Sequence, residues 1–283
     1  MTLSPSPAGR FAGSVTVITG AGSGIGRALA LALGRRGALM VCTDVDATSA
    51  AETRDLVASA GGQAWDMVLD VTKSGDHAAV RDFCLSRWGR VDRIVNNAGV
   101  VALGLPQNLT VDVWRRSIDI NLLGLVRGNE VFLPVFLEQG SGHLVNTAST
   151  SGLFPYSFDR TAYVATKAAV VALTESLALY LRPQGIDVSC VCPAGVRTGM
   201  PNRMTRHGPQ QPIGAPALPV VDPDDFAEHV VGAFAAGDFL ICSTPEAFDA
   251  LARCGADLDA NLDAAVERYG SRTSTATTRR PSG

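Results

Sequence analysis

A glycine-rich segment constrains the fold of this chain more than any other feature. It follows a short β-branched run, residues 14–19, and precedes a helical pattern over residues 27–36. The spacing does not fit GxGxxG but fits TGxxxGxG over residues 19–26. Glycines at such a junction let the backbone approach a pyrophosphate, and the helix N-terminus supplies N–H donors. The pattern favours a dinucleotide site over a merely flexible turn. The cofactor-binding residues predicted in this loop are Gly20, Ser23, Gly24, Ile25 and Gly26.

Strand-like and helix-like segments alternate along the chain. The expected strands cover residues 14–19, 38–43, 64–69, 91–95, 143–147, 185–191 and 239–242. The expected helices cover residues 27–36, 47–60, 76–88, 110–138 (one helix or two), 162–181, 222–235 and 245–269 (with a break near Gly255). This alternation predicts one α/β domain, a doubly wound parallel sheet of about seven strands with helices on both faces. The domain is expected over residues 14–270, between an N-terminal arm, 1–13, and a disordered tail, 271–283.

Composition and charge exclude several classes of function. The formal net charge is −3 and the basic residues are scattered, so nucleic acid is not an expected partner. The first eleven residues contain no apolar signal-peptide core. No later apolar run is expected to reach the roughly 18 residues that are needed to span a bilayer. The six cysteines show no CxxC pair and no histidine at zinc spacing, which predicts buried thiols and no metal site. We expect a cytoplasmic protein with no membrane partner.

Asp44 ends the second expected strand, eighteen residues beyond Gly26. Dinucleotide-binding folds place there the carboxylate that binds the adenosine ribose hydroxyls. A 2′-phosphate beside that carboxylate would be repelled by roughly several kcal/mol at an effective dielectric near 20. Val45 and Ser23 offer no cation at the two places where one would bind a 2′-phosphate. The sequence therefore predicts NAD(H) in preference to NADP, unless Asp44 only belongs to the turn that caps the next helix.

Polar and small residues follow three further expected strands. Asp70 and Val71 follow the third, and their carboxylate and backbone N–H are candidates for the adenine edge. The fourth ends in NNAG at residues 96–99, and the fifth ends in ASTSG at residues 148–152. Open α/β sheets bind ligands at this carboxyl edge. Asn121 stands among apolar residues, so it is either a satisfied structural hydrogen-bonder or part of a site.

Tyr163 and Lys167 form a YxxxK pair at the start of the helix expected over residues 162–181. Residues four apart share one face of a helix, so the ammonium can lie beside the phenol. An adjacent cation favours the phenolate and lowers the pKa of a tyrosine from its ordinary value of about 10. The pair therefore indicates acid–base chemistry, although Tyr and Lys at this spacing are more often an ordinary pair.

The ordered set of motifs resembles the short-chain dehydrogenase/reductase family in its compact, NAD-binding form. The matching segments are TGAGSGIG at 19–26, Asp44, Asp70-Val71, NNAG at 96–99, Asn121, Ser149, YVATK at 163–167 and PAGVRT at 193–198. The resemblance covers roughly residues 14–198 and implies a Rossmann-type fold with a catalytic tetrad. The tetrad consists of Asn121, Ser149, Tyr163 and Lys167. One departure is Ala194, where the family usually has glycine after the proline.

The resemblance also implies a role for each residue of the site. The tyrosine exchanges a proton with the substrate oxygen, the serine hydrogen-bonds that oxygen, and the lysine lowers the tyrosine's pKa and holds the nicotinamide ribose. The asparagine region anchors a water that relays protons. Such roles suit a general acid/base with donors aimed at a developing alkoxide. Further cofactor contacts are expected from Asp70, Val71, Asn97, Ala98, Gly99, Tyr163, Lys167, Pro193, Val196 and Thr198. Family members are often tetramers, so a homotetramer or homodimer is expected.

The substrate end of the chain is the Pro/Gly-rich segment of residues 199–221, which in this family is a mobile lid. Its methionines offer an adaptable apolar wall. The candidate substrate residues are Ser151, Leu153, Phe154, Tyr156, Met200 and Met204. They favour a hydrophobic secondary alcohol or ketone, unless these side chains only pack against the lid or a neighbouring subunit.

The sequence thus predicts an NAD(H)-dependent oxidoreductase that interconverts a secondary alcohol and a ketone by hydride transfer. One alternative is a catalytically idle NAD-binding sensor or scaffold on the same fold. Another is a dehydratase or epimerase that uses NAD transiently.

Overall fold

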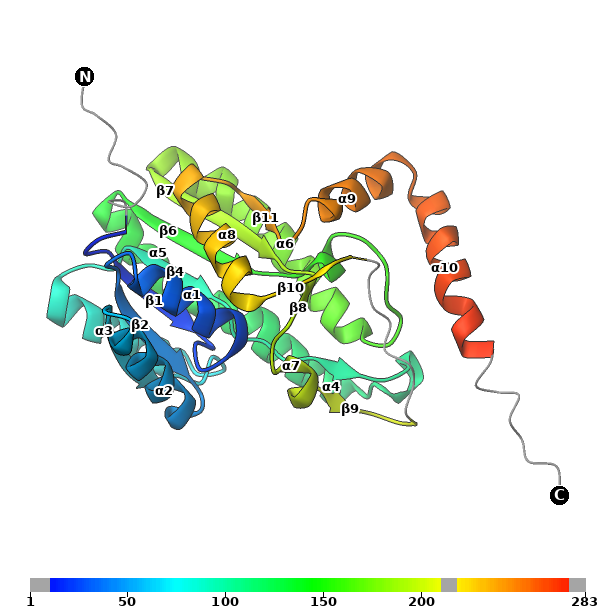
Figure 1. The fold of residues 1–283 in the computed structure, drawn as a ribbon, viewed down its shortest axis with the longest axis horizontal. Helices are drawn as coiled ribbons and strands as arrows, with labels where there is room; N and C mark the ends of the chain where they lie inside the picture. The colour runs from blue at the N-terminus through cyan, green and yellow to red at the C-terminus, as the bar shows by residue number, and fades with distance from the viewer. Residues whose placement is uncertain (1–10, 210–217, 275–283) are drawn as a thin grey trace.

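The computed structural model describes residues 11–209 and 218–274 (Figure 1). Most of the expected arm, part of the expected lid and the last residues of the expected tail therefore lie outside the described residues. Seven strands form one sheet in the order β11-β7-β6-β4-β1-β2-β3, and every pairing in it is parallel. In chain order they are β1 (Val15–Thr19), β2 (Leu39–Asp44), β3 (Gln63–Val68), β4 (Arg93–Asn96), β6 (Gly142–Thr147), β7 (Ile186–Cys192) and β11 (Leu240–Cys242).

The central strands are buried along almost their whole length because both faces of the sheet are covered. All five residues of β1 are buried, and Val17 pairs with Val41 on one side and Ile94 on the other. Strands buried on both faces are typical of parallel sheets. The predicted doubly wound parallel sheet, its single domain and the seventh strand at the edge are confirmed.

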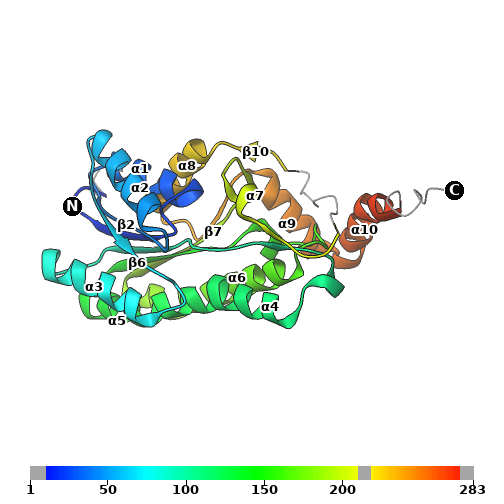
Figure 2. The ribbon, with the colours of Figure 1, turned by 90° about the horizontal axis from the view of Figure 1, so that it is seen from below.

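Helices cover both faces of the sheet (Figure 2). One face carries α1 (Gly24–Gly34), α2 (Ala47–Ser59) and α8 (Pro223–Ala236). The other carries α3 (Ser74–Trp88), α4 (Val111–Ile118), α5 (Gly124–Gln139) and α6 (Thr161–Leu181). Each interface has its own core, with Leu29 and Phe234 on the first face and Phe132 and Leu181 on the second, all almost fully buried. Because the strands are parallel and joined by βαβ crossovers, the strand ends that carry polar residues all lie at one edge of the sheet.

Three helices differ from their expected bounds. The first begins at Gly24, inside the glycine loop, three residues before the expected start. The stretch expected as one helix or two is α4 and α5, joined by a π-helical turn, Asp119–Leu123. The last stretch is broken at Asp257, two residues after Gly255, into α9 (Glu246–Ala256) and α10 (Leu258–Ser274). The helix α10 continues four residues past the expected start of the tail at 271.

Short elements shape the region after β7. Strand β8 (Gly195–Val196) pairs with β10 (Val220–Val221), and β5 (Ala102–Leu103) pairs with β9 (Thr205–Arg206). The helix α7 (Met200–Arg203) lies between β8 and β9 in the chain. Short 3-10 turns cover Pro106–Asn108, Thr150–Gly152 and Arg182–Gln184. The two described parts of the expected lid are thus paired with other segments, β9 with β5 and β10 with β8.

Two helical stretches, Val111–Gln139 and Thr161–Gln184, are long and apolar enough to cross a membrane by length and composition alone. The expectation that no stretch meets that criterion was wrong, because the π-helical turn keeps α4 and α5 continuous and α6 runs on into the next turn. The criterion is weak evidence, since core helices of soluble proteins also meet it, and both stretches pack against the sheet (Figure 2).

Candidate active site

The glycine loop is held against the end of β4 at distances that leave no room for a side chain. Gly20 has a φ of +66°, and a Cβ there would lie 2.9 Å from the Cα of Ala98. A Cβ on Gly26 would lie 2.3 Å from the carbonyl oxygen of Gly20. The first amides of α1 have no acceptor within the helix, so they are available to an anion. The loop therefore fits the diphosphate of a dinucleotide.

Thr19 and Asn97 fix this loop to the neighbouring strand. The Thr19 hydroxyl accepts hydrogen bonds from the backbone N–H groups of Asn97 and Ala98, at 3.0 and 3.1 Å. The Asn97 side-chain amide donates to the carbonyls of Thr19 and Gly20 at 3.1 and 3.2 Å. The side chain of Asn97 therefore supports the loop, and its position beside the cofactor stays a prediction.

Asp44 lies against the loop and also belongs to the turn before α2. Its carboxylate accepts hydrogen bonds from the backbone N–H of Gly22 at 3.0 Å and of Asp46 at 3.2 Å. The cap of α2 is Asp46, which accepts from the N–H of Thr48 at 3.1 Å. Asp44 thus holds the end of β2 and the glycine loop together, and its contact with a ribose hydroxyl stays a prediction.

Asp70 and Val71 follow β3 on the same edge of the sheet. One Asp70 oxygen accepts from both the N–H and the hydroxyl of Thr72, at 3.0 and 2.7 Å, and these bonds lower the pKa of Asp70. Val71 is buried beneath the start of α5, where a Cβ on Gly124 would lie 2.9 Å from its side chain. The Asp70 carboxylate is therefore engaged locally, and its contact with an adenine edge stays a prediction.

Asn121 lies in the π-helical turn and is 2% exposed. Its side-chain oxygen accepts from the N–H of Val100 at 2.8 Å, and its amide donates to the Val100 carbonyl and to the Thr166 hydroxyl at 3.0 and 3.2 Å. These bonds join α4–α5 to the NNAG segment and to α6. π-helical turns within α-helices are frequent at functional sites. Asn121 is therefore a structural residue whose side chain has hydrogen-bond partners, and it also lies beside the other candidate site residues.

Lys167 is buried, 3% exposed, and its ammonium donates to the carbonyl of Thr147 at 2.6 Å. Burial lowers the pKa of Lys167 to about 8. The ammonium lies 5.8 Å from the centroid of the Tyr163 ring and near Gly99, where a Cβ would be 3.6 Å from it. The lysine thus joins the end of β6, the NNAG segment and the tyrosine.

Tyr163 lies one turn before Lys167 on α6, near enough to the Ser149 side chain for that hydroxyl to influence its pKa. Burial raises the pKa of Tyr163 to about 12, while the hydrogen bond to Ser149 and the charge of Arg160 act in the opposite direction. The sequence had predicted a lowered pKa. That direction was wrong here because desolvation of the phenolate outweighs the cations, and Lys167 directs its protons to a carbonyl.

Ser149 lies two residues after the end of β6 and caps the turn that follows. It is 4% exposed, donates to the Ser151 hydroxyl and the Pro193 carbonyl at 3.3 Å each, and accepts from the N–H of Ser151 at 3.2 Å. The structure therefore gathers all four predicted tetrad residues at one end of the sheet, from the segment after β6, from α6 and from the π-helical turn.

The segment after β7 lies over the glycine loop. The Pro193 carbonyl accepts from the N–H of Thr150 at 3.0 Å, and the N–H of Ala194, the departure from the family pattern, donates to the Ser243 hydroxyl at 3.0 Å. Val196 belongs to β8, and the Thr198 side chain lies 3.1 Å from where a Cβ on Gly24 would stand. Pro193, Val196 and Thr198 are thus at the site, and their contacts with the nicotinamide stay a prediction.

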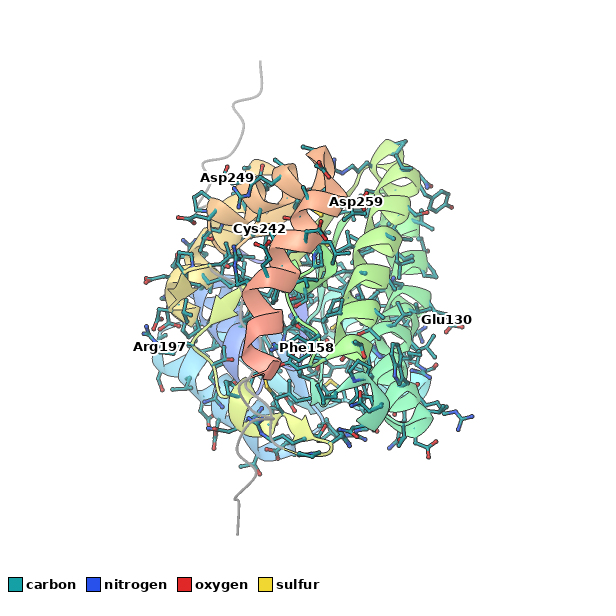
Figure 3. All side chains as sticks on the ribbon, turned by 90° about the vertical axis from the view of Figure 1, so that its right-hand side faces the viewer. Glu130, Phe158, Arg197, Cys242, Asp249 and Asp259 are labelled. Carbon is teal, nitrogen blue, oxygen red and sulfur yellow. The ribbon has the colours of Figure 1, made fainter. Side chains whose placement is uncertain are left out.

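The predicted substrate residues fall into two groups. Phe154 and Tyr156 are buried and form a cluster, the aromatic cluster, with the partly buried side chains of Leu153, Phe158, Leu218, Ala250, Leu251, Cys254 and Ala265. Figure 3 labels Phe158 beside α10. In this chain α9 and α10 therefore cover the segment that follows Ser149. Met200 is exposed and Met204 half-buried, and neither belongs to this cluster.

The sequence analysis did not predict two arginines that contact the glycine loop. Arg27 donates from one nitrogen to the Gly22 carbonyl and the Glu52 carboxylate, and from another to the Thr53 hydroxyl. Arg203, from α7, donates to the Ser23 hydroxyl at 2.6 Å. Arg27 stands next to the TGxxxGxG motif, which was a usable signal. Arg203 lies 180 residues from Ser23 in a segment without periodicity, so no sequence signal places it there.

A phosphate-binding loop and a Tyr–Ser–Lys group at the same edge of a parallel sheet define a class, the dinucleotide-binding oxidoreductases. A family model described as "short chain dehydrogenase" matches residues 14–208. The chain belongs to this family, and it is an oxidoreductase that binds a nicotinamide dinucleotide.

Individual relatives agree with this assignment. The chain is 37% identical over 197 residues to a "Putative oxidoreductase SadH" of Mycobacterium tuberculosis, covering 69% of this chain and 71% of that protein. It is 34% identical over 190 residues to a "Cyclohexanol dehydrogenase" of Acinetobacter sp., covering 67% and 75%. A crystal structure of a short chain dehydrogenase/reductase from Burkholderia phymatum in complex with NAD matches with a TM-score of 0.78 and 32% identity, covering 88% of this chain and 95% of that chain.

Proposed function

We propose that this protein interconverts a hydrophobic secondary alcohol and its ketone, with NAD(H) as the preferred cofactor. The observation that carries the proposal is the meeting of Tyr163, Ser149 and the buried Lys167 at the sheet edge that holds the glycine loop, with the Lys167 ammonium 5.8 Å from the centroid of the Tyr163 ring. The cofactor, when bound, supplies or accepts the hydride. A scaffold that only binds NAD has no need of a buried lysine and a nearby phenol at that edge.

The side chains of the site transfer and position the proton that the substrate oxygen gains or loses. In the reducing direction, Tyr163 is the general acid: its raised pKa keeps the phenol protonated near neutral pH, ready to donate to the substrate oxygen. The Ser149 hydroxyl stabilises charge on that oxygen. Lys167 places its amine 5.8 Å from the centroid of the Tyr163 ring, and its pKa of about 8 leaves that amine mostly charged near neutral pH.

The aromatic cluster supports an apolar substrate. Leu153, Phe154 and Tyr156 follow Ser149 in the chain and pack against apolar residues of α9 and α10, and we expect them to form one side of the substrate site. An apolar lining with few polar groups is typical of small-molecule sites. The likeness to a cyclohexanol dehydrogenase points to the same kind of substrate, an alcohol whose carbon skeleton carries no charge.

Asp44 supports the preference for NAD. Its half-buried carboxylate is fixed by two backbone N–H groups, and it would repel a 2′-phosphate bound beside it. Arg203 brings a cation to the nearby Ser23, but that arginine is exposed and its charge is screened by water and salt. The fixed carboxylate is therefore expected to decide the preference.

The test is NAD reduction, followed by NADH absorbance, over a panel of secondary alcohols from small polyols to alicyclic and steroid-sized compounds, with NADP in parallel. Tyr163→Phe is expected to lower the rate at least 100-fold, because general acid–base catalysis contributes about 10²–10⁴-fold, and to leave NADH affinity nearly unchanged.

Turnover confined to charged or polyol substrates would contradict the proposal of an apolar substrate. Full activity of the variant would remove the phenol from the mechanism. Conversion of substrate without net NADH formation would favour the transient use of NAD by a dehydratase or epimerase.

A further inference from the structure

An arginine of the expected lid contacts the residue at the start of α1. Arg203, the last residue of α7, donates from Nη1 to the Ser23 hydroxyl at 2.6 Å. Ser23 is the N-cap of α1, and an N-cap serine usually accepts from a backbone N–H of the first turn. In the described chain the Ser23 side chain makes no such capping bond, so the N–H groups at the start of α1 stay available to an anion. A guanidinium and these N–H groups thus lie at the same end of the glycine loop.

The neighbouring segments hold α7 beside the glycine loop. Before the helix, the Thr198 side chain lies against Gly24, where a Cβ would be 3.1 Å from it. After the helix, β9 pairs with β5, and the N–H of Thr205 donates to the Val101 carbonyl at 3.1 Å. The helix is thus anchored on one side to the loop and on the other to the strand that follows NNAG. Arg203 therefore contacts the loop from a segment that is held at both ends.

The charge of Arg203 is not neutralised by a carboxylate of the described residues, among which it forms no salt bridge. Arg27, the other arginine at the loop, differs in this respect, because it forms a salt bridge with Glu52 at 2.9 Å. A guanidinium has five N–H donors, and the bond to one hydroxyl leaves most of them for a ligand. The fold therefore presents an unneutralised cation where the anion of a dinucleotide is expected.

We propose that Arg203 is a cofactor-binding residue whose guanidinium binds the diphosphate that the glycine loop holds. Guanidinium groups form charge-assisted, often bidentate hydrogen bonds with phosphate oxygens. The inference rests on the dinucleotide cofactor of the proposed function and holds for any alcohol substrate. The diphosphate is favoured over a 2′-phosphate because Arg203 meets the N-cap of α1, whereas the Asp44 carboxylate, which would repel a 2′-phosphate, accepts from the N–H of Gly22. Since NAD and NADP share the diphosphate, Arg203 adds affinity for both and leaves the preference to Asp44.

The test is titration calorimetry of the ligand-free protein with ADP-ribose, which carries the diphosphate without the nicotinamide. R203Q is expected to weaken the binding of ADP-ribose and NADH about tenfold at low salt, which is within the range for a lost hydrogen bond to a charged group. The loss is expected to shrink as salt screens the exposed guanidinium. Adenosine, which has no phosphate, should bind both proteins equally when its affinity is measured by competition with NADH. The ratio of NADH affinity to NADPH affinity should stay unchanged.

Two further variants are the controls. R203K keeps the charge and is expected to recover part of the ADP-ribose affinity. R206Q removes an exposed arginine of β9, three residues further along the chain, and is expected to bind every ligand as the wild-type protein does. An equal loss in R206Q would contradict the proposal, because it would reflect only the net charge of this surface.

Unchanged ADP-ribose affinity in R203Q would overturn the proposal, and so would an equal loss for adenosine, which would mean that the variant only disturbs the loop. A loss for NADPH alone would also overturn it, because the ligand of Arg203 would then be the 2′-phosphate. Failure of the proposed function is a different result, namely no oxidation of any alcohol in the panel. The affinity measurements need no alcohol, so they test the role of Arg203 in either case.

Discussion

At the scale of single residues, Asp44 offers a direct test of cofactor choice. Asp44→Ala removes the carboxylate that would repel a 2′-phosphate and bind ribose hydroxyls, so the ratio of kcat/KM for NAD to that for NADP is expected to fall at least tenfold. Asp46→Ala is the matched control, because it removes the cap of α2 at a stability cost of about 1 kcal/mol and lies outside the loop. An unchanged cofactor ratio in Asp44→Ala would show that Asp44 only organises the turn.

Lys167 is a second residue whose environment makes a measurable prediction. Its pKa falls from 10.5 to about 8 on burial, so below pH 8 the native state carries a desolvated ammonium. Between pH 8 and 10.5 the unfolded state binds a proton that the native state has lost, and the wild-type free energy of unfolding rises with pH. Lys167→Met is therefore expected to be inactive yet more stable at pH 7, by roughly 1–3 kcal/mol.

Denaturant unfolding at several pH values checks this prediction. The stability advantage of Lys167→Met is expected to shrink from pH 8 upward and to vanish near pH 10.5. Lys73→Met, at an exposed lysine, is the control and should show no such trend. A pH-independent difference between Lys167→Met and the wild-type protein would mean that the lysine keeps its ordinary pKa in the fold.

The resemblance of the ordered motifs to a known family implied the tetrad, and the structure brings its four residues to one edge of the sheet, while their catalytic roles stay a prediction. The pKa direction of Tyr163 could not be predicted, because it depends on how much solvent the whole fold removes from the phenol. Nor could Arg203 be placed beside Ser23, since that contact joins an irregular segment to a loop 180 residues earlier. The hydroxyl of Tyr156 was read only as part of an apolar wall, because its bond to Ser151 depends on the turn after Ser149.

At the scale of elements, the glycine loop depends on contact between backbone segments. Gly26→Ala would place a Cβ 2.3 Å from the Gly20 carbonyl, so the loop must shift, and NADH affinity is expected to fall at least tenfold. The matched control is Gly232→Ala in the exposed middle of α8, where a Cβ meets no atom within 4 Å. That control is expected to stabilise the protein by about 0.5–1 kcal/mol and to leave binding unchanged. Fluorescence titration with NADH measures both, and equal affinities for the two variants would contradict a tightly packed loop.

Most strands and helices followed from the apolar pattern because buried parallel strands and their crossovers leave strong signals. The π-helical turn did not, since the extra residue is stabilised by the bonds of Asn121 to Val100 and Thr166, far along the chain. The start of α1 was also misplaced, because glycines at 24 and 26 weaken the helical pattern that the tertiary contacts restore. The sequence thus predicts elements well and their functional irregularities poorly.

At the scale of the whole molecule, the exposed apolar side chains on two neighbouring helices suggest assembly. Leu179 and Tyr180 on α6, and Val126 on α5, are 82%, 59% and 38% exposed. We propose that these helices bury such residues in a homotetramer or homodimer. Light scattering is expected to give a mass of four, or two, times the 29.5 kDa of one chain. Leu179→Glu should reduce that mass, and a wild-type mass of one chain would contradict the proposal.

The helices α9 and α10 come after the last strand of the sheet and lie beyond residues 14–208, where the family model matches. They contribute side chains to the aromatic cluster, and α9 also buries Ala247 in the core beside Ala148, while the candidate tetrad and the glycine loop lie on other elements (Figure 1). We propose that α9 and α10 take part in choosing the substrate, on a stretch of sequence that follows the candidate tetrad. Random mutagenesis restricted to residues 246–266 is then expected to change the range of accepted alcohols while hydride transfer stays intact, and this C-terminal region would be a starting point for engineering new selectivity.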